Sequence, residues 1–314
     1  MARNKVQFQK GLSEAQFGEL YGSEALCRAA LVGWRWPAGF ECPSCEGREH
    51  CTVKRGPRIL YQCNTCRKQT SVTAGTVFAS SKLPLRLWFK AMYLLTQSKK
   101  GISSIELGRR LGVTQTAAWT LKHKLAQVMM ERNAARRLKG EVQMDDAYLG
   151  GERPGAYGRE GKAPFLAAVS LTGDGQPDQI VLRRVGRFCN AAIVRVAGAA
   201  FEAGVHAVSD GLRCFSSVEK AGCTHTAIKT GSGPKAAKHP RFKWVNTVLG
   251  NIKAAMVGTF RAVRDKHTPR YLAEFEYRFN RRYRLDAMIA RLAYVSLRTA
   301  PMPYRLLKLA DVYA

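Results

Sequence analysis

Acidic residues are scarce in this chain of 314 residues. It contains 23 Asp plus Glu against 51 Lys plus Arg, which gives a formal net charge of +28 and a pI of about 10.2. Such an excess attracts polyanions over long range and favours salt-dependent phosphate contacts. Hydrophobic residues still make up 46% of the chain, which is enough for a packed core and excludes a disordered basic tail. The composition therefore indicates a folded protein that handles nucleic acid.

Long apolar runs, internal repeats and low-complexity tracts are also missing. No stretch approaches the ~20 apolar residues of a membrane-spanning helix. The first residues, Met1 to Phe8, contain no apolar core of a secretion signal. We therefore expect a cytoplasmic protein without membrane association, and the length predicts two or three domains.

Nine cysteines cannot all pair with one another, which argues against a framework made only of disulfides. Four of them form two Cys-x-x-Cys pairs, Cys42/Cys45 and Cys63/Cys66, separated by seventeen residues. Each pair places two thiolates on one tight turn, and four such ligands suit tetrahedral Zn²⁺. The alternative is a redox-active or merely buried set, although a thioredoxin-type motif needs one pair beside a βαβ pattern. The other cysteines are predicted to be reduced, mostly buried thiols: Cys27, Cys51, Cys189, Cys214 and Cys223.

Residues 1–80 are predicted to form an N-terminal helix followed by a zinc ribbon. Helix-like spacing of apolar residues precedes the first cysteine pair. Between the pairs, residues 52–54 and 58–62 have the character of two short strands with a turn at Gly56. A two-stranded piece this small needs the metal to hold it.

Residues 81–137 are predicted to be a helix-turn-helix DNA-binding domain. Ser103 and Glu106 are spaced as a capping box, Gly112 marks a turn, and Thr114 is placed to cap a second helix. That helix should bury an apolar stripe made of Ala118, Leu121, Leu125 and Val128. Its other face would meet a DNA major groove through Gln115, Thr116, Trp119 and Lys122. The alternative is an ordinary helical hairpin.

Residues 138–314 are predicted to form an α/β domain with a C-terminal helical region. Apolar runs separated by glycine-rich turns indicate three strands in series, and then helices alternate with two more strands. The strands are predicted near residues 142–149, 165–171, 179–185, 206–211 and 224–229. This order of elements is that of an RNase H-like domain.

Because carboxylates are scarce, those at predicted strand ends stand out as candidate metal ligands. Asp145 and Asp146 lie on the first strand of this domain, and Asp210 ends the fourth. In an RNase H-like sheet these strands are neighbours, so their aspartates would share one edge and bridge divalent ions. Two such ions activate an attacking water or 3′-hydroxyl and stabilise the leaving oxygen of a phosphodiester. The alternative is that Asp210-Gly211 is only a turn and Asp146 only an exposed charge.

Several segments together resemble a bacterial insertion-sequence transposase of the DDE superfamily, in the group with an N-terminal zinc ribbon. They are the cysteine pairs, the helix-turn-helix, residues 144–151, Ser209-Asp210-Gly211, residues 239–253 and residues 270–282. The resemblance covers nearly the whole chain. It implies a nucleoid-associated bacterial enzyme with Mg²⁺ or Mn²⁺ in its catalytic domain and a structural Zn²⁺ in the ribbon.

The resemblance also assigns catalytic positions. The first aspartate of the family falls on Asp145, with Asp146 at the following glutamate position, and the second falls on Asp210. Since successive strand residues point to opposite faces, we expect only one of the first pair to be a ligand, and choose Asp145. Asn246 stands where a glutamate is implied, and Lys253 follows two helical turns later. An amide oxygen can ligate Mg²⁺, and the lysine would grip a phosphate. The alternative interpretation of Asn246 is a helix N-cap.

A basic segment precedes this helix and is predicted to bind DNA as an electrostatic rim. Its candidate contacts are Lys235, Lys238, His239, Arg241 and Lys243, with the histidine as a secondary candidate. Further on, a helix is predicted to bury Tyr271, Leu272, Phe275 and Phe279. Its arginines would face DNA, with a purely solvated face as the alternative: Arg270, Arg278, Arg281, Arg282 and Arg284.

The sequence thus predicts a transposase that binds terminal inverted repeats and performs metal-dependent strand cleavage and strand transfer. Its partners would be double-stranded DNA, both element ends and target, and further copies of itself, because two ends must be paired. One alternative is a catalytically inactive, transposase-derived DNA-binding regulator, which Asn246 leaves open. A second is an RNase H-like nuclease or resolvase that recognises DNA structure.

Overall fold

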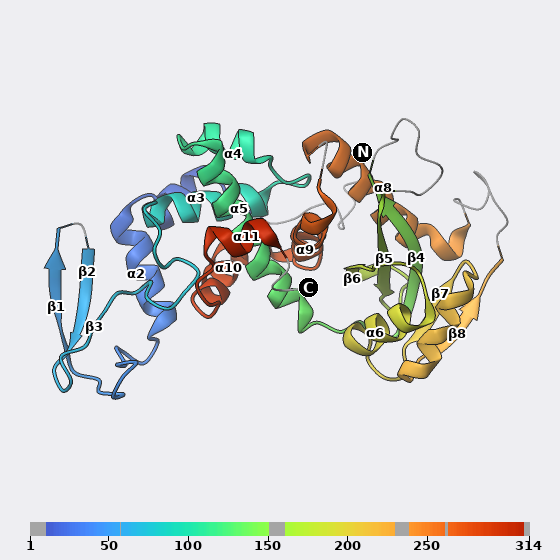
Figure 1. The fold of residues 1–314 in the computed structure, drawn as a ribbon, viewed down its shortest axis with the longest axis horizontal. Coiled ribbons are helices and arrows are strands. Elements are labelled where there is room, and N and C mark those ends of the chain that lie inside the picture. The colour runs from blue at the N-terminus through green and yellow to red at the C-terminus, as the bar shows by residue number, and fades with distance from the viewer. Residues whose placement is uncertain (1–10, 57, 151–160, 230–238, 261–262, 311–314) are drawn as a thin grey trace. The chain divides into compact units, whose positions relative to one another are not determined.

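The computed structural model describes residues 11–56, 58–150, 161–229, 239–260 and 263–310. The chain divides into two compact units (Figure 1). The first comprises Met1–Ser98, Ser104–Val128 and Tyr283–Leu309, and the second comprises Lys99–Ser103, Met129–Arg282 and Ala310–Ala314. The last helices, predicted as part of the α/β domain, therefore group with the N-terminal helices. The predicted boundaries at residues 80 and 137 stay predictions.

Helices make up most of the first unit. They are α1 (Glu14–Tyr21), α2 (Glu24–Arg35), α3 (Leu85–Gln97), α4 (Ser104–Leu111), the first part of α5 (Gln115–Ala134), α10 (Met288–Ser296) and α11 (Tyr304–Leu309). The side chains of Ser13 and Ser23 cap α1 and α2. The carboxylate of Glu24 accepts the first N–H groups of α3, from Leu85 and Arg86, at 2.9 and 3.0 Å. No helix among the described residues has both the length and the apolar character needed to cross a membrane.

A tight turn joins α4 and α5. Gly112 has a φ of +67°, in the left-handed region that favours glycine. The hydroxyl of Thr114 accepts the N–H of Ala117 at 3.3 Å, as predicted for a cap. The turn lies close to α4, since a Cβ added to Gly108 would stand 3.0 Å from the carbonyl oxygen of Val113. The predicted apolar stripe of α5 is buried: Ala118, Leu121, Leu125 and Val128.

The zinc-ribbon segment is a three-stranded antiparallel sheet in the order β1-β2-β3. Its strands are β1 (His50–Arg55), β2 (Arg58–Cys63) and β3 (Gln69–Thr70). Rings of Trp36, Phe40, His50 and Tyr61 pack beside one another, with neighbouring centroids 4.7 to 5.5 Å apart. Among the described residues, the buried hydrophobic cluster of this sheet consists of Phe40 and two cysteines. So small a core cannot hold such a sheet without a further cross-link.

The second unit is built on a five-stranded mixed sheet in the order β6-β5-β4-β7-β8. Its strands are β4 (Glu141–Leu149), β5 (Ala163–Leu171), β6 (Pro177–Arg184), β7 (His206–Ser209) and β8 (Thr224–Ala227). β5 is antiparallel to both β4 and β6, whereas β7 is parallel to β4 and β8 is parallel to β7. This arrangement confirms the predicted mixed α/β domain and is consistent with an RNase H-like fold.

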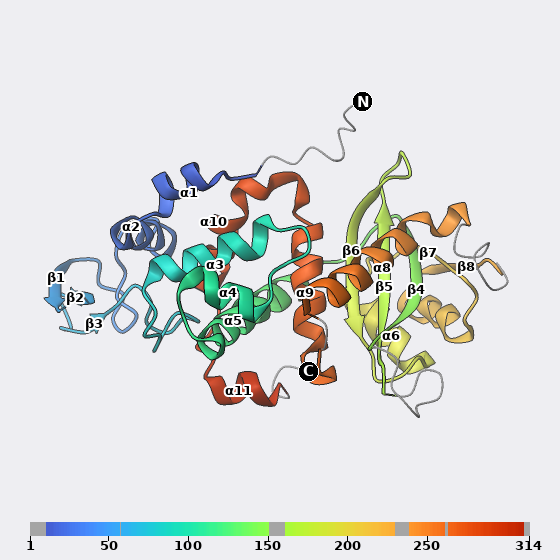
Figure 2. The ribbon, with the colours of Figure 1, turned by 90° about the horizontal axis from the view of Figure 1, so that it is seen from above.

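Helices cover both faces of this sheet (Figure 2). One face carries α6 (Asn190–Ala200) and the 3₁₀ helix η1 (Arg213–Ala221), and the other carries α8 (Lys243–Ala255) and α9 (Thr268–Phe279). Alternate residues of β4 serve the two cores. Val142 and Met144 pack on the side of α6, whereas Ala147 and Leu149 pack on the side of α8. The strand is buried on both faces, so a residue's position in this alternation decides which helices its side chain contacts.

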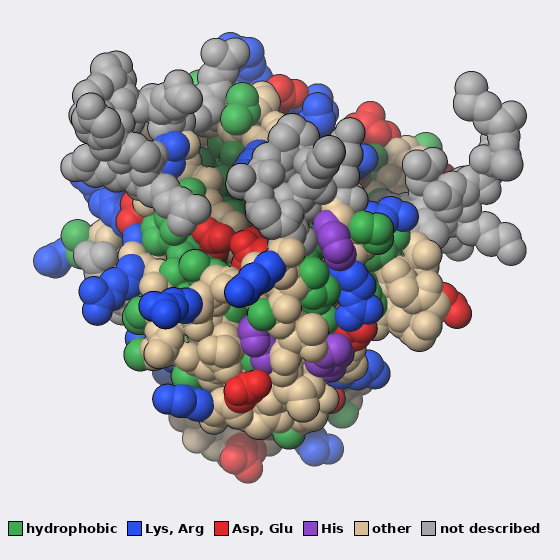
Figure 3. Space-filling view, turned by 90° about the vertical axis from the view of Figure 1, so that its right-hand side faces the viewer, with side chains coloured by type: hydrophobic (Ala, Val, Ile, Leu, Met, Phe, Trp, Pro, Cys, Tyr) green, Lys and Arg blue, Asp and Glu red, His purple; other side chains and the backbone are tan. Residues whose placement is uncertain are grey.

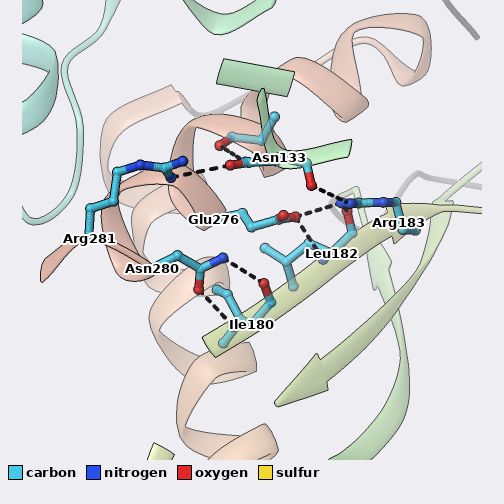
Figure 4. A network of polar contacts seen from close by, with 8 residues as sticks. Asn133, Ile180, Leu182, Arg183, Glu276, Asn280 and Arg281 are labelled. Carbon is cyan, nitrogen blue, oxygen red and sulfur yellow. Dashed lines mark hydrogen bonds and ion pairs between the residues drawn. The ribbon is translucent and has the colours of Figure 1, made fainter. Parts of the chain in front are cut away.

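The end of α9 closes the outer edge of β6 with polar side chains (Figure 4). Asn280 donates to the carbonyl of Ile180 at 2.8 Å and accepts its N–H at 2.7 Å, as a neighbouring strand would. Glu276 accepts the N–H of Leu182 at 3.0 Å and pairs with Arg183 at 2.7 Å. These bonds occupy backbone groups that an edge strand otherwise offers to another chain.

Most arginines of the α9 region are buried, so their predicted DNA-facing position is wrong. Four of the five are 3–9% exposed: Arg270, Arg278, Arg281 and Arg282. Acceptors inside the fold hold them: Arg278 pairs with Glu274 at 2.5 Å, and Arg282 donates to the carbonyl of Asp178 at 2.8 Å. The exception is Arg284, which is exposed. The predicted apolar stripe does face the core, where Leu272 and Phe275 are buried and Tyr271 and Phe279 are partly buried.

Candidate active site and zinc ribbon

β4 and β7 bring together aspartates that are distant in the sequence. The two strands pair in parallel, with Gln143 opposite Val208. Continuing this register by two residues sets Asp145 opposite Asp210, the first residue after β7. A carboxylate oxygen of Asp145 and one of Asp210 lie within 4.8 Å of each other. The predicted pair therefore shares one edge of the sheet.

Asp146 belongs to the same cluster, although strand alternation argues against it. Asp145 points to the side of α8 and Asp146 to the side of α6, yet a carboxylate oxygen of Asp146 is also within 4.8 Å of the other two. The N–H of Asp146 donates to Oδ1 of Asp145 at 2.8 Å, so the Asp145 side chain lies along the strand. Both side chains of the pair therefore reach the site, and the choice of Asp145 as the ligand stays a prediction. Three carboxylates converge, and we call them the acidic cluster.

The electrostatics of the acidic cluster fit a divalent cation. Burial, together with the charges of Asp210 and Asp146, raises the pKa of Asp145 to about 7, while Lys253 acts to lower it. Three carboxylates this close repel one another, and a bound divalent ion relieves that repulsion. Carboxylate oxygens suit hard cations such as Mg²⁺ or Mn²⁺. On the face shown in Figure 3, one small group of acidic side chains lies among lysine, arginine and histidine side chains.

A hydrogen-bonded turn presents Asp210 at the end of β7. Gly211 has a φ of +91°, which favours glycine. The N–H of Leu212 donates to Oδ1 of Asp210 at 3.2 Å. The buried hydroxyl of Ser209 accepts the N–H of Gly211 at 3.3 Å and lies 2.9 Å from Nε2 of His225 on β8. The predicted turn is thus compatible with the candidate metal site, because the turn positions the carboxylate of Asp210 within the acidic cluster.

α8 carries the remaining catalytic candidates. The helix starts at Lys243 and its N-cap residue is Phe242, so Asn246 lies within the first turn and its interpretation as an N-cap is wrong. Lys253 is exposed, two turns further along. Its positive charge acts to lower the pKa of Asp145. Asn246 is half-buried, and its role as a ligand stays a proposal.

The predicted zinc ligands form a second cluster, in the first unit. The Sγ atoms of four cysteines lie within 4.8 Å of one another: Cys42, Cys45, Cys63 and Cys66. The two Cys-x-x-Cys turns share one backbone pattern. In each, the first cysteine accepts the N–H of the residue four positions on and donates to the carbonyl five positions on, all at 3.0 Å. The residue after the second cysteine, Glu46 or Arg67, has a φ of 59° or 62°. This repeated turn aims both thiols of a pair at one point.

The ionisation of these thiols also fits a bound cation. The N–H of Cys66, opposed by burial and helped by the N–H of Thr65, lowers the pKa of Cys63 to about 6. Opposed by the N–H of Gly47, the surrounding cysteine sulfurs raise the pKa of Cys45 to about 12. Four clustered thiols cannot all ionise without a positive charge between them, and Zn²⁺ supplies it. The tetrad fits a structural zinc site.

Comparison with known families agrees with both clusters. Residues 22–69, which include the cysteine tetrad, match the family described as the transposase zinc-ribbon domain. Residues 137–280, which include the acidic cluster, match the family described as the ISXO2-like transposase domain. Residues 137–280 are thus similar to an ISXO2-like transposase domain, and residues 22–69, which precede them in the sequence, are similar to a transposase zinc ribbon.

A relative supports the same assignment over part of the chain. It is described as an uncharacterized protein in transposable element ISH50 of Halobacterium salinarum, and it is 30% identical over 146 residues. The match covers 45% of this chain and 46% of the relative, so the chain spans about half the length of the curated protein it matches. Since that organism is an archaeon, the predicted bacterial origin stays a prediction.

Gln143 is a residue of the transposase domain that sequence reasoning missed. Its side chain is 3% exposed, and its Oε1 accepts the N–H groups of Trp244 and Val245, both at 3.1 Å. N–H groups in the first turn of a helix have no partner within that helix. Gln143 lies two positions before Asp145, so both face the side of α8. The amide therefore ties the helix bearing Asn246 to the strand bearing Asp145. A polar residue within an otherwise apolar buried stretch of β4 was the available signal.

The residues predicted as an electrostatic rim of the transposase domain differ in their surroundings. His239 accepts the N–H of Arg241 through Nδ1 at 3.3 Å and so caps a short 3₁₀ turn. Arg241 pairs with Glu141 at 3.4 Å, and Lys243 is exposed at the start of α8. Two further candidates lie outside the described residues, Lys235 and Lys238.

The candidate DNA contacts on α5 differ in how exposed they are. Gln115 and Thr116 are exposed at the start of the helix. Trp119 is half-buried and stacks on His123, with ring centroids 4.0 Å apart. Lys122 is 2% exposed, so it has no surface to offer a DNA groove, and we remove it from the candidate set.

Proposed function

We propose that this protein is a DNA transposase that binds the terminal inverted repeats of an insertion sequence, cleaves at their ends and joins them to target DNA. The observation that carries the proposal is the convergence of Asp145, Asp146 and Asp210 within an ISXO2-like transposase domain. The net charge of +28 supports a polyanionic substrate.

The chemistry would centre on the acidic cluster, which would hold Mg²⁺ or Mn²⁺ with the amide oxygen of Asn246 as a further ligand. A divalent ion bound there supplies Lewis-acid activation of a phosphodiester and of the attacking water or 3′-hydroxyl. Lys253 would hold a phosphate oxygen by charge. Gln143 would keep α8 in place relative to β4 before DNA binds. Hydrolysis and strand transfer are both in-line displacements at phosphorus, so the same residues can serve both.

The first unit would recognise double-stranded DNA. α4 and α5 would act as a helix-turn-helix, with Gln115, Thr116 and Trp119 towards the major groove. The zinc ribbon would add a second contact. Because two element ends must be brought together for transposition, we infer that the protein works as a homo-oligomer on DNA.

A strand-transfer assay tests the proposed function. The zinc-loaded full chain is incubated with duplexes that carry the terminal repeats of the element and with a target plasmid. We expect nicking at the repeat ends and joining to the plasmid only when Mg²⁺ or Mn²⁺ is added, and neither reaction with scrambled ends. Specific binding of the ends without nicking would favour the DNA-binding regulator, which the amide of Asn246 keeps open. Preferential cleavage of branched DNA would favour a structure-specific nuclease.

Gln143 offers a separate test of how the site is assembled. Replacing Gln143 with Leu removes the acceptor of two α8 N–H groups, and we expect kcat for cleavage to fall about 10- to 100-fold with little change in KM for DNA, since small displacements of catalytic groups are costly. Gln143→Glu keeps an acceptor, and a carboxylate is favourable at a helix N-terminus. This variant should retain most of the activity. Equal losses in both variants, or a loss confined to KM, would contradict a positioning role.

A further inference from the structure

A basic hollow of about 510 Å³ lies where β6 ends and α6 begins, outside the acidic cluster. Four arginines line it, together with Cys189 and small apolar residues, and no acidic residue is among its described lining. The arginines are Arg183, Arg184, Arg187 and Arg195. We call this hollow the arginine cradle.

Two of these arginines are neutralised and two are not. Arg183 pairs with Glu276 at 2.7 Å, and Arg184 pairs with Asp265 at 2.5 Å. Arg187 and Arg195 are exposed, and neither has an ion pair with a carboxylate in the part of the chain that the structure describes. The first pair therefore builds the wall of the cradle, and the second pair gives it an uncompensated positive charge.

The start of α6 adds to this positive field. The N–H of Ala192, with the side chain of Arg187, lowers the pKa of the Cys189 thiol at the N-cap position of the helix. The same environment that favours a thiolate favours any anion placed there. Guanidinium groups prefer phosphate oxygens among such anions, because their planar donors match them in pairs.

The cradle and the acidic cluster lie towards the same end of the sheet, where β4, β6 and β7 have their C-terminal ends. β6 runs in the same direction as β4, because both are antiparallel to β5, so their C-terminal ends are on one side. Two aromatic rings lie between the cradle and the acidic cluster. The ring centroid of Tyr148 on β4 is 5.7 Å from that of Phe188, which precedes α6.

We propose that the arginine cradle binds the phosphate backbone of the DNA strand that flanks the cleaved position. The proposal rests on the proposed function, and it adds a holding site for the substrate beside the reacting phosphate. Arg187 and Arg195 would each neutralise a phosphate. The cradle would thereby fix the strand at a second point, and the scissile bond would be held between this point and Lys253.

The reactivity of Cys189 tests occupancy of the cradle in the unaltered full chain. N-ethylmaleimide labelling is followed by peptide mass spectrometry, with and without a duplex carrying the element end. Saturating DNA should slow the alkylation of Cys189 several-fold, and salt that dissociates the complex should restore the rate. Unchanged alkylation at DNA saturation would overturn the proposal.

Substitution of the two unpaired arginines gives an independent measurement. Arg187→Gln with Arg195→Gln should lower DNA affinity about tenfold at moderate salt and reduce the slope of log K against log salt by about two, which is roughly 0.9 per phosphate contact. The matched control is Lys220→Gln, an exposed residue at the far end of η1, near the start of β8 and the opposite sheet edge. It should change the affinity much less.

The outcomes separate the cradle from the proposed function. If the parent cleaves and joins its ends while the double variant keeps the parental affinity and salt slope, the cradle proposal is overturned and the transposase proposal stands. If the parent neither binds nor cleaves its ends, both fail. Binding of an acidic peptide in preference to the duplex, with protection of Cys189, would assign the cradle to a protein partner and would also overturn the proposal.

Discussion

Replacing Asp145 with Asn is expected to reduce strand cleavage by at least ~10³-fold, since metal-ion stabilisation of developing charge is worth several kcal/mol and each ~1.4 kcal/mol is tenfold in rate. Asp210→Asn should have an effect of the same order, because both carboxylates belong to the acidic cluster. Asp174→Asn is the matched control, as this exposed aspartate lies in the turn between β5 and β6, and cleavage should be unchanged. Undiminished cleavage by Asp145→Asn would remove Asp145 from the mechanism.

The same substitution should alter how the stability of the metal-free protein depends on pH. Because the pKa of Asp145 is raised from 3.8 to about 7, the folded protein keeps a proton that the unfolded chain releases between about pH 4 and pH 7. The free energy of unfolding therefore falls as the pH rises through this window, by on the order of 2–4 kcal/mol from Asp145 alone.

Thermal unfolding at about pH 5 and pH 8, with and without Mg²⁺, measures this effect. The Tm of metal-free Asp145→Asn should fall less between the two pH values than that of the parent. At pH 8, Mg²⁺ should stabilise the parent clearly and the variant weakly, because the ion relieves the repulsion that the substitution has already reduced. Parallel pH profiles and equal responses to Mg²⁺ would show that Asp145 is not a metal ligand.

Loss of one zinc ligand is expected to unfold the ribbon. In Cys63→Ser, bound Zn²⁺ should fall from about one per chain to near zero, since structural zinc contributes ~10–16 kcal/mol in small domains and this binding energy is folding energy. The aromatic group around Phe40 is too small to replace it. Backbone amides of β1 and β2 should then lose their protection from hydrogen exchange, while β4 and β5 in the second unit keep theirs.

Cys51→Ser is the matched control for the zinc prediction. Cys51 is an exposed cysteine on β1, and it lies outside the sulfur cluster. This variant should retain its zinc and the protection of the ribbon amides. If Cys63→Ser kept a full equivalent of zinc together with protected amides, the tetrad would not be the metal site.

Features encoded over short stretches are predicted well from the sequence. The Cys-x-x-Cys turns depend only on hydrogen bonds between nearby backbone groups, and the Thr114 cap likewise depends on one nearby N–H group. The strand order is also predictable, because apolar runs punctuated by glycines mark each strand. The pairing of the first and fourth strands, which brings Asp145 and Asp210 together, is expected instead from the likeness to an RNase H-like sheet.

Features that depend on distant partners are not predictable in this way. Arg282 looks like a solvated charge until the carbonyl of Asp178, far away in the sequence, is found beside it. Lys122 has the spacing of a groove-facing residue but is buried. Gln143 acquires its meaning only when the first turn of α8 is placed against β4. In each case a polar group is matched to a partner that no local pattern specifies.

The outer side of β6 has a consequence for how copies of this chain can assemble. Asn280 and Glu276 form hydrogen bonds with main-chain groups of β6 that would otherwise pair with an incoming strand. Among the described strands, the other edge of this sheet is β8, the short strand at the opposite end of the order, and a sheet continuous across two molecules would grow there. Protomers that gather on DNA would join at the β8 edge or through helices, loops or the duplex itself, and the β6 edge of the sheet would remain closed on assembly.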